Sequence, residues 1–389
     1  MEFKEHILGE FIDTISDTTP INKEKVILIN TSDIENGYVL NHDYVDNKNL
    51  KGQFKKRFKK GDILYSEIRP RNKRFAYVDF ESEDYIASTK LMVLRNKGNI
   101  NNNFLFQLLK SDKIINHLQM LAESRSGTFP QITFNELANI VVCIPKMKIQ
   151  ANIANFLQLI DKKIELNNKI NDNLYELAIN YLNEKVDSNE VLISNFAKIQ
   201  GGYAFKSKDL IDNHTNNRII KIKNLRSEIN ADVINSQFVE DEVVKKLDNK
   251  FKLTKGDVAI AMTGAELGKT GFIYGNDNYY LNQRVGVIRG NNKESELYLK
   301  ILFLSENFQI LLNSKGYGSA QPNVSTSDIE NILINDITED NLNDFYERVE
   351  PIYKKIISNC EEILNLERLR NTLLPKLMNG EIDLNNIEI

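Results

Sequence analysis

The chain has 389 residues and a formal net charge of −4, and this length allows two or three domains that each bury a core. Two cysteines, Cys143 and Cys360, exclude a disulfide framework and a cysteine-rich metal site, and we interpret both as lone buried thiols. No run of about 18 apolar residues occurs, and the N-terminus MEFKEHILGEF is charged where a signal peptide is apolar, so we expect a cytoplasmic protein without membrane contact.

Charge is distributed unevenly along the chain. Residues 51–74 hold ten Lys or Arg against two acidic residues, whereas residues 336–389 hold twelve acidic against six basic. The basic run is interleaved with Phe54, Phe58 and Tyr65, which is typical of nucleic-acid surfaces, because cations displace counterions from phosphates and aromatic rings contact bases or sugars. A solvated protein surface is an equally good interpretation of the charge alone.

Residues 1–145 are predicted to form the first of two mixed α/β globular parts. Runs with strand-like composition lie at 25–30, 62–68, 74–80, 90–95 and 139–144. A single helix is expected near Asn103 to Leu121. No regular β-α-β alternation occurs, which favours a small α+β module over a doubly wound nucleotide-binding sheet.

Two long helices are predicted, over residues 146–186 and 338–380, because apolar side chains recur at steps of three and four residues. The first stripe consists of Ile153, Leu157, Ile160, Ile164, Asn167, Asn171, Leu174, Ala178 and Tyr181. The second consists of Leu342, Phe345, Val349, Ile352, Ile356, Asn359, Ile363, Leu366, Arg370, Leu373 and Leu377. Each helix would measure about 55 Å, longer than a globular core needs, so the two most simply pair with each other.

Two polar residues, Asn167 and Asn359, occupy equivalent positions in these stripes. A seam asparagine can fix the register of a helix pair, and a frayed, hydrated position is an equal alternative. The segment before the second helix, Asn335–Asp340, lacks the proline found at Pro145 before the first. The sequence therefore places the start of the second helix only to within several residues.

The second globular part, residues 187–337, contains AMTGAELGKTG, which resembles a phosphate-binding loop. Such a loop needs four residues between its glycines and leads into a helix, whereas Gly264 and Gly268 enclose three residues and Phe272-Ile-Tyr-Gly is typical of a strand and turn. We therefore favour a loop between two strands over an ATP site. Strands are expected at 218–225, 257–262, 271–275, 284–290 and 331–335, with a helix near 296–312.

The chain contains an internal repeat. FPQITFNELANI aligns with QPNVSTSDIENI at an offset of 192 residues, which places Asn139 over Asn331. At an offset of 195, Lys73–Phe75 aligns with Gly268–Thr270. Both copies thus place a basic connection between two strands, which suits a loop that lies along a nucleic-acid backbone or enters a groove.

Catalytic and metal-binding motifs are missing from the sequence. The four histidines are scattered, with no His-Glu-x-x-His pair and no Cys/His cluster, which argues against a zinc site. No Asn-Pro-Pro-aromatic tetrapeptide or Gly-rich cofactor loop is present, and neither copy offers a compact acidic pair with a lysine. We therefore expect no catalytic residue, no metal site and no cofactor in this chain.

Several motifs resemble those of the specificity subunits of Type I restriction-modification systems. RNTLLPKLMNGEI at 370–382 is similar to the hallmark end of that family. KGDILYSEIRP at 60–70, GYAFKSK at 202–208, IIKIKNL at 219–225 and GSAQPNVS at 318–325 also resemble family segments. The resemblance covers essentially the whole chain, including its order of globular part, helix, globular part and helix.

The resemblance implies that residues 1–145 and 187–337 are target-recognition domains, each reading one half of a split double-stranded DNA site. It implies that residues 146–186 and 338–380 form an antiparallel coiled coil that serves as spacer and docking surface, before a tail at 381–389. Two modification subunits, which bind S-adenosylmethionine and methylate adenine, and two ATP- and Mg-dependent restriction subunits would assemble on the chain. The chain itself would be a non-catalytic reader of DNA sequence.

Reading DNA requires phosphate contacts that set the register and side chains at base edges that identify the sequence. The candidates for these contacts in the first copy are Lys55, Lys56, Arg57, Lys59, Arg69, Arg71, Lys73 and Arg74. Those in the second copy are Lys206, Lys208, Lys269, Thr270, Gln283 and Arg284. A solvated position is an equally good interpretation of any single lysine, and the loops Gly127-Thr128 and Gly318–Gln321 are equally well explained as structural turns.

The copies differ where they would read DNA, because GYAFKSK occurs only in the second and the first has Asp17–Ile21 near its start. We therefore predict an asymmetric site. If the helices act as a spacer, inserting or deleting a heptad within Ile153–Tyr181 should change the gap between the half-sites. Three alternatives stay open: a stand-alone sequence-specific DNA-binding protein, a coiled-coil adaptor without a DNA role, and an enzyme with an unrecognised nuclease site.

Overall fold

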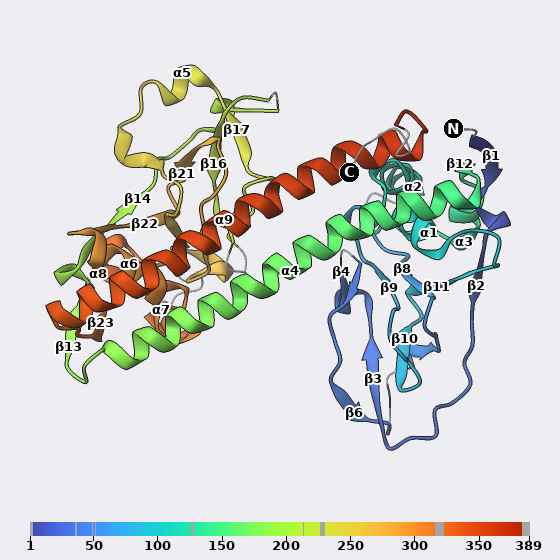
Figure 1. The fold of residues 1–389 in the computed structure, drawn as a ribbon, viewed down its shortest axis with the longest axis horizontal. Helices are drawn as coiled ribbons and strands as arrows, with labels where there is room; N and C mark the ends of the chain where they lie inside the picture. Colours follow the sequence, from blue (N-terminus) through green and yellow to red (C-terminus); the bar gives the residue numbers. More distant parts are fainter. Residues whose placement is uncertain are drawn as a thin grey trace. The chain divides into compact units, whose positions relative to one another are not determined.

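The computed structural model is an α+β protein organised as two compact units. Unit 1 comprises Met1–Lys162 with Arg368–Ile389, and unit 2 comprises Lys163–Glu367. The residues that the structure describes are 3–35, 37–48, 50, 52–125, 128–212, 214–225, 230–315 and 323–382. Each unit combines a globular part with segments of two long helices, α4 (Met147–Lys185) and α9 (Glu339–Met378) (Figure 1).

Strands make up most of the regular structure in the globular part of unit 1. They are β1 (Phe3–Ile7), β2 (Ile12–Ile15), β3 (Lys25–Ile29), β4 (Ile34–Glu35), β5 (Tyr38–Val39), β6 (Tyr44–Asp46), β7 (Phe54–Lys56), β8 (Ile63–Ser66), β9 (Phe75–Tyr77), β10 (Tyr85–Ser88), β11 (Leu91–Asn96) and β12 (Val141–Pro145). An antiparallel sheet has the order β2-β11-β8-β9. A mixed sheet has the order β6-β3-β10-β7, and β1-β12 and β4-β5 form short ladders.

Unit 2 repeats this plan. Its strands are β13 (Glu190–Leu192), β14 (Ala197–Gly201), β15 (Leu210–Ile211), β16 (Asn217–Ile220), β17 (Gln237–Val239), β18 (Lys252–Leu253), β19 (Val258–Ala261), β20 (Thr270–Phe272), β21 (Asn278–Leu281), β22 (Val285–Gly290) and β23 (Leu333–Asn335). The antiparallel sheet β14-β22-β19-β20 corresponds to β2-β11-β8-β9, and the parallel pair β16-β21 corresponds to β3-β10. The predicted duplication of one α+β module is confirmed.

The prediction of a single helix in each globular part is wrong, because each predicted segment forms two helices. They are α1 (Asn102–Leu109) and α2 (Asp112–Arg125) in unit 1, and α6 (Lys293–Leu304) and α7 (Glu306–Lys315) in unit 2. The hydroxyl of Ser111 donates to the Leu108 carbonyl at 2.7 Å, and that of Ser305 donates to the Leu302 carbonyl at 2.6 Å. A serine hydroxyl competes with backbone donors for helix carbonyls, and it ends the first helix of both pairs.

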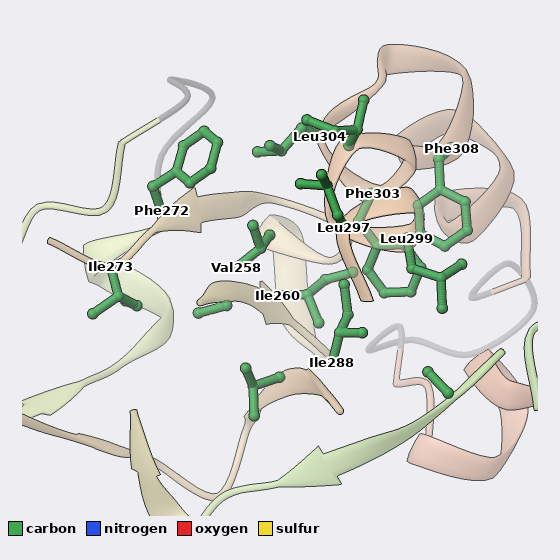
Figure 2. Close-up of a cluster of buried hydrophobic side chains, with 14 of the residues drawn as sticks. Val258, Ile260, Phe272, Ile273, Ile288, Leu297, Leu299, Phe303, Leu304 and Phe308 are labelled. Carbon is green, nitrogen blue, oxygen red and sulfur yellow. The ribbon is translucent and has the colours of Figure 1, made fainter. Parts of the chain in front are cut away.

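Unit 2 packs its antiparallel sheet against α6 and α7 (Figure 2). The buried side chains labelled there are Val258, Ile260, Phe272, Ile273, Ile288, Leu297, Leu299, Phe303, Leu304 and Phe308. The Phe303 and Phe308 rings stack with centroids 4.2 Å apart. Burial of each such side chain stabilises the fold by about 1.5–3 kcal/mol, so this core holds β19 and β20 firmly in place.

The two long helices begin and end within two residues of the predicted bounds. The second begins at Glu339, where the Thr338 hydroxyl accepts a hydrogen bond from the Asn341 amide. Inside each unit α4 and α9 pack together, as predicted from their stripes. The pairing is antiparallel in unit 2, since higher-numbered residues of α4 contact lower-numbered residues of α9 there. In unit 1, Asp161 of α4 contacts Arg370 of α9.

The predicted seam residues all lie at least partly inside the protein. The buried ones are Ile153, Leu157, Ile160, Asn167, Ile356, Asn359 and Ile363. The half-buried ones are Ile164, Leu174, Ile352, Leu366 and Leu373. These side chains therefore serve the packing of α4 on α9 and on the globular parts.

An asparagine pair crosses the helix seam in unit 2. The Nδ2 of Asn359 donates to the Oδ1 of Asn171 at 2.8 Å, and both side chains are buried. The Cys360 thiol donates to Asn230 Oδ1 at 3.0 Å and accepts a bond from Asn171 Nδ2. Burial raises the pKa of this thiol to about 12. The frayed alternative for Asn359 is thus excluded, and the pair fixes the register of the helices here.

Charged side chains also take part in the seam. In unit 2, Asn167 Nδ2 donates to Glu362 Oε2 at 2.9 Å. In unit 1, the Asp161 carboxylate lies 2.7 Å from Lys110 Nζ and 2.8 Å from Arg370 Nη1. Burial alone would raise the pKa of Asp161, but its attraction to Lys110 and the bonds from Lys110 and Arg370 hold that pKa below its ordinary value.

Both cysteines are free thiols, Cys360 buried and Cys143 half-buried, so the interpretation as lone buried thiols holds fully for Cys360. Across the described ranges, no helix is long and apolar enough to cross a membrane. Among the same described residues, no group of three or more His, Cys, Asp or Glu is arranged so that it could hold a metal ion.

Candidate nucleic-acid interface

The stretch that resembles a phosphate loop is the turn of an antiparallel hairpin. β19 pairs with β20, and Gly264–Glu266 between them forms a short 3₁₀ turn. The amides of Leu267, Gly268 and Lys269 donate to carbonyls within the hairpin. A phosphate-binding loop needs such amides free and aimed at the anion, so this turn is not built for ATP. The preference for a loop between two strands is confirmed.

The glycines of this turn serve its backbone. Gly264 has φ of 80° and Gly268 has φ of 82°, in the left-handed region that glycine enters at little cost. The corresponding hairpin of unit 1, β8-β9, contains the 3₁₀ turn Pro70–Asn72. There the left-handed positions are Arg69, with φ of 46°, and Lys73, with φ of 53°.

Arg69 and Lys73 align with Gly264 and Gly268 at the offset of 195 residues found for this region of the internal repeat. The two turns thus share two left-handed positions, although their 3₁₀ segments are displaced by one residue, and unit 1 places cations where unit 2 places glycines. A left-handed backbone costs a non-glycine residue roughly 1–2 kcal/mol, so unit 1 retains strain at two positions of its turn. Such strain occurs at functional sites more often than elsewhere, which favours a role for these two side chains.

A neighbouring segment supports each hairpin in the same way. In unit 1 the Arg69 amide donates to the Pro130 carbonyl, and Ile68 bridges to Gln131. In unit 2 Thr263 bridges to Asn323. The candidate residues Gly127 and Gly318–Gln321 lie outside the described residues, although each precedes one of these supporting segments in the chain.

Three cations of the unit 1 hairpin point their side chains outward. Arg69, Arg71 and Lys73 are exposed: Arg69 Nη2 donates to the Thr128 carbonyl at 3.3 Å, and Lys73 Nζ lies 3.2 Å from Asp112. Arg74 differs, because it is half-buried and its guanidinium donates to two carbonyls, those of Ser32 and Ile34, at 3.2 and 3.1 Å. Arg74 therefore stabilises the fold, whereas the other three side chains reach the solvent.

The basic strand β7 and the residues after it contain exposed cations and one lysine that is hydrogen-bonded within the fold. Lys55 and Lys59 are exposed. Lys56 is half-buried and donates to the carbonyls of Thr89 and Leu91, and burial lowers its pKa. Lys56 therefore stabilises the sheet, and its ammonium group is occupied by these carbonyls instead of a phosphate.

Lys55 and Arg57 line a pocket together with Thr18–Ile21, the segment at which the two copies differ in sequence. The interpretation of the interleaved aromatic residues as DNA contacts is wrong for Phe58 and Tyr65, which are 5% and 1% exposed. Both point into the core because the strands that carry or adjoin them are covered there. The basic character of this surface therefore rests on its cations.

In unit 2 the structure brings three segments to the end of the antiparallel sheet. Gln283 and Arg284 are exposed on the turn between β21 and β22. The Arg284 carbonyl accepts a bond from the Met262 amide of the β19-β20 hairpin at 3.0 Å. Tyr203, which follows β14, bridges to Asn282 of the same turn. Gln283 and Arg284 thus lie beside both the hairpin and the GYAFKSK segment.

The other candidates of unit 2 lie in different environments. Lys206 and Lys208 are exposed. Lys269 is partly exposed and forms an ion pair with Glu266, three residues before it. Thr270 is 2% exposed in β20, with its hydroxyl near Gln309, so it lies inside the protein and contributes no side chain to the surface.

Sequence reasoning missed an aromatic cluster in unit 2. The ring of Tyr203, 37% exposed, packs edge-on against Phe205 and Phe251 with centroids 5.0 and 5.6 Å apart. Lys250 adds a cation over the Phe251 ring at 5.1 Å. The motif GYAFKSK contains two of the three rings, but Phe251 is distant in the sequence and only the fold places it there.

The model of the Type I restriction modification DNA specificity domain matches this chain twice, over residues 2–176 and 185–335. The chain belongs to the specificity subunits of Type I restriction-modification systems. The family resemblance drawn from its motifs is confirmed. The two matched segments also agree with the duplication seen in the sheets.

Known specificity subunits are similar to this chain over most of their lengths. The Type I restriction enzyme HindI specificity subunit of Haemophilus influenzae is 27% identical, covering 98% of this chain and 100% of the relative. The MjaIX specificity subunit of Methanocaldococcus jannaschii is 23% identical over 84% of this chain and 78% of its own. The Type I S subunit from M. genitalium is 14% identical, with a TM-score of 0.54 and coverage of 97% and 96%, and shares the fold.

Specificity subunits are non-catalytic DNA-recognition components. The exposed cations of the β8-β9 hairpin and the Tyr203–Arg284 surface of unit 2 are therefore the candidate reading surfaces of this specificity subunit. The assignment of individual residues to DNA stays a prediction.

Proposed function

We propose that this specificity subunit reads an asymmetric, two-part DNA site, with one part read by each unit. The observation that carries the proposal is the pair of hairpins with the same two left-handed positions and different side chains there. Unit 1 offers Arg69 and Lys73 where unit 2 offers Gly264 and Gly268. Because base edges are distinguished by the donors and acceptors they meet, two such readers select different sequences.

Unit 1 reads its half with cations. Arg69 and Arg71 present guanidinium groups that can bond the O6 and N7 of guanine bidentately in the major groove. Lys73, with Lys55 and Lys59, supplies phosphate contacts that set the register of the domain on the duplex. On binding, Arg71 and Lys73 exchange their contacts with Glu123 and Asp112 for contacts with DNA.

Unit 2 reads its half with fewer cations. Gln283 matches the N6 and N7 pattern of adenine, and Arg284 beside it matches guanine or a phosphate. Tyr203 offers an aromatic ring to a sugar or a thymine methyl group, and Lys206 and Lys208 contact phosphates. The glycines of the β19-β20 turn permit a close approach of the backbone to DNA.

The chemistry belongs to partner subunits in this proposal. Two modification subunits carry S-adenosylmethionine and methylate adenine, and restriction subunits carry ATP and Mg²⁺. Support comes from membership in the specificity family and from the β19-β20 turn, whose amides are engaged within the hairpin. A chain that acts on chromosomal DNA in this way would work in the cytoplasm of a prokaryotic cell.

The direct test is to map methylated adenines in cells with and without this chain. Loss of one asymmetric bipartite motif is the expected result, and unchanged methylation would refute the proposal. Replacing Arg69 and Arg71 by Ala should then relax only one half of the motif, whereas replacing Gln283 and Arg284 should relax only the other.

Three measurements separate the alternatives. A chain that never co-purifies with a modification subunit would be a stand-alone DNA-binding protein. DNA binding without salt dependence would favour an adaptor without a reading role, because phosphate contacts release counterions. Cleavage of DNA by the purified chain with Mg²⁺ would reveal a nuclease.

A further inference from the structure

The turn that joins β10 to β11 in unit 1 corresponds to the turn that joins β21 to β22 in unit 2. In unit 1 the Glu67 amide, just after β8, donates to the Lys90 carbonyl of this turn at 3.0 Å. In unit 2 the Met262 amide, just after β19, donates to the Arg284 carbonyl at 3.0 Å. Lys90 is therefore the structural counterpart of Arg284, and both side chains are exposed. The candidates drawn from the sequence included Arg284 and missed Lys90.

Gln131 lies beside Lys90, on the segment that supports the β8-β9 hairpin. The backbone of Gln131 bridges to Ile68. The amide of Ile132, the next residue, donates to the Glu67 carbonyl at 2.9 Å. Glu67 thus holds the Lys90 turn through its amide and the Gln131 segment through its carbonyl. Two segments that are distant in the sequence therefore meet beside the hairpin whose exposed cations are described above.

The side chains of these two segments form a hydrogen-bonded pair at the surface. Lys90 Nζ donates to Gln131 Oε1 at 3.3 Å. Because an ammonium group carries only donors, the amide must turn its oxygen toward Lys90, and its Nε2 group keeps two N–H donors for other partners. Within the described ranges, the Gln131 side chain makes no other hydrogen bond. The pair therefore offers donors to a bound molecule, while the acceptor of the amide is engaged by the ammonium group.

Lys90 forms no ion pair with any residue that the structure describes, whereas Lys73 of the hairpin lies 3.2 Å from Asp112. The nearby Glu67 carboxylate lies 4.0 Å from Lys56 Nζ. Burial lowers the pKa of Lys56, and the positive charge of Lys90 lowers it further. Two lysines that repel each other in this way favour a ligand that brings electron-rich atoms to Lys90.

A pair that offers only donors distinguishes the two purines. In the major groove guanine presents the acceptors O6 and N7, whereas adenine presents the N7 acceptor beside an N6 amino donor. A glutamine on its own matches adenine, because its amide offers a donor and an acceptor. With Lys90 beside its oxygen, Gln131 would meet adenine with a positive charge next to the N6 amino group, which is unfavourable. Guanine is free of this conflict and matches the donors of both side chains.

We propose that Lys90 and Gln131 are a specificity-determining pair that reads one guanine in the half-site of unit 1. The Lys90 ammonium and the Gln131 Nε2 group donate to O6 and N7 of that guanine, and Lys90 also orients the Gln131 amide. This inference rests on the function proposed above and adds to it a residue pair and a base. Because the glutamine alone would select adenine, the side chain at position 90 decides which purine unit 1 accepts there.

A solvated surface contact is the simplest alternative for this pair. An exposed hydrogen bond of 3.3 Å adds little to stability, so neither side chain is required for the fold. The backbones of both segments, by contrast, are fixed by their bonds to Glu67 and by the bridge to Ile68. Substitutions of Lys90 and Gln131 should therefore change the surface and leave the scaffold intact.

Methylation mapping tests the pair directly. The full chain is expressed in cells with the modification subunit of the same system, and methylated adenines are mapped for wild type and for Lys90→Met. The wild-type motif should require guanine at one position of the half that the Arg69→Ala, Arg71→Ala variant relaxes. Lys90→Met removes the charge and frees the amide oxygen, so methylation of sites with adenine at that position should rise roughly tenfold or more relative to guanine sites.

Three further variants separate base reading from general charge. Lys90→Arg keeps a cation that can only donate, and it should retain the requirement for guanine. Gln131→Ala removes one donor and should weaken the preference for guanine without creating one for adenine. Lys60→Met is the matched control, because Lys60 is another exposed lysine of unit 1 and lies 3.4 Å from Glu81. This control should leave the base preference unchanged.

The outcomes distinguish this inference from the function on which it rests. A wild-type motif without guanine in the half assigned to unit 1 would overturn the pair and leave the proposed function standing. The same holds if Lys90→Met keeps the wild-type preference, or if it and Lys60→Met lower methylation equally without a change of base. Absence of any bipartite motif that depends on this chain would overturn the proposed function and the pair with it.

Thermal melting of each purified variant checks that it is folded. Should Lys90→Met fail to fold, Gln131→Ala decides alone, since an unchanged requirement for guanine in that variant refutes the pair.

Discussion

The β8-β9 hairpin of unit 1 and the β19-β20 hairpin of unit 2 have left-handed residues at the same two positions of their turns. Unit 2 has glycine at both positions, whereas unit 1 has Arg69 and Lys73. The difference shows which part of the hairpin is scaffold and which part is variable. The left-handed positions and the supporting segment are shared, and the side chains that reach outward are not.

The helix seam shows a similar contrast between the units. Unit 2 pairs the neutral Asn171 and Asn359, whereas unit 1 holds the charged Asp161 between Lys110 and Arg370. A buried charge network is more sensitive to the loss of one member than a neutral pair, because a charge is left without its partner. The two units therefore should differ in how they respond to substitution and to pH.

The largest effect on stability is expected in unit 1. Asp161→Asn leaves Lys110, which is 11% exposed, facing no carboxylate, and should lower the free energy of unfolding by about 3 kcal/mol. Asn359→Leu strands the amide of Asn171 and should cost about 1–2 kcal/mol. Urea titration of each variant measures both, and equal losses would contradict the contrast.

The same network predicts a dependence on acid. The pKa of Asp161 in the folded protein lies below its ordinary value, so its contribution is fully present above the ordinary carboxylate pKa and is lost as pH falls through the lowered one. Asp161→Asn should flatten the acid limb of a stability profile measured by thermal melting. An unchanged limb would show that other carboxylates dominate it.

The next effect concerns the reading surface of unit 1. The combined change Arg69→Ala, Arg71→Ala and Lys73→Ala should lower DNA affinity on the order of 100-fold, since base-edge contacts are worth about 1–3 kcal/mol each. Each lost phosphate contact should also reduce the slope of log affinity against log salt by about 0.9. Fluorescence anisotropy at several salt concentrations measures both quantities.

A control for this variant removes three exposed cations of unit 1 that lie outside the hairpin. Lys60→Ala, Lys97→Ala and Lys148→Ala together change the net charge equally. This control should lower affinity only slightly. A loss as large as that of the hairpin variant would mean that the overall charge of the unit, rather than the hairpin, drives binding.

A smaller effect isolates the backbone strain. Arg69→Gly and Arg69→Ala remove the same side chain, but only glycine relieves the left-handed conformation, so the glycine variant should be more stable by about 1 kcal/mol. Gly264→Ala should cost unit 2 a similar amount, because a Cβ there meets no atom within 4 Å and only the backbone matters. Equal stability of the two Arg69 variants would remove the argument from strain.

The smallest effect is expected at Lys269. Its charge is shared with Glu266, so Lys269→Ala should weaken DNA binding only a few-fold and reduce the salt slope by less than about 1. Glu266→Gln frees the lysine and should change affinity in the opposite direction. If Lys269→Ala leaves both affinity and slope unchanged, the β19-β20 turn does not belong to the reading surface.

Much of the fold follows from patterns in the sequence. The internal repeat, the two long helices and the seam through Asn359 depend on periodicity, which a regular helix preserves along its whole length. The hairpin around Gly264 could be recognised because its glycine spacing and the strand after it do not fit a phosphate loop. These features can be recognised from the spacing of residues along the chain.

What could not be predicted depends on contacts between distant segments. The burial of Phe58 and Tyr65, and the bonds that occupy Lys56, depend on strands that only the folded sheets bring together. The cluster of Tyr203 with Phe251 has the same origin. The helix breaks at the serines were missed because apolar spacing continues across them, and a single hydroxyl decides where the helix ends.

The reactivity of Cys360 can report on local opening of unit 2. Its thiol is buried between α4 and the globular part, and a pKa near 12 keeps it protonated and unreactive in the closed unit. Alkylation of Cys360 can therefore proceed only when α9 separates from α4 and the globular part, and the alkylation rate measures how often this opening occurs. Cys143, half-buried in β12 of unit 1, provides a second alkylation site on the same chain, measured on a separate peptide.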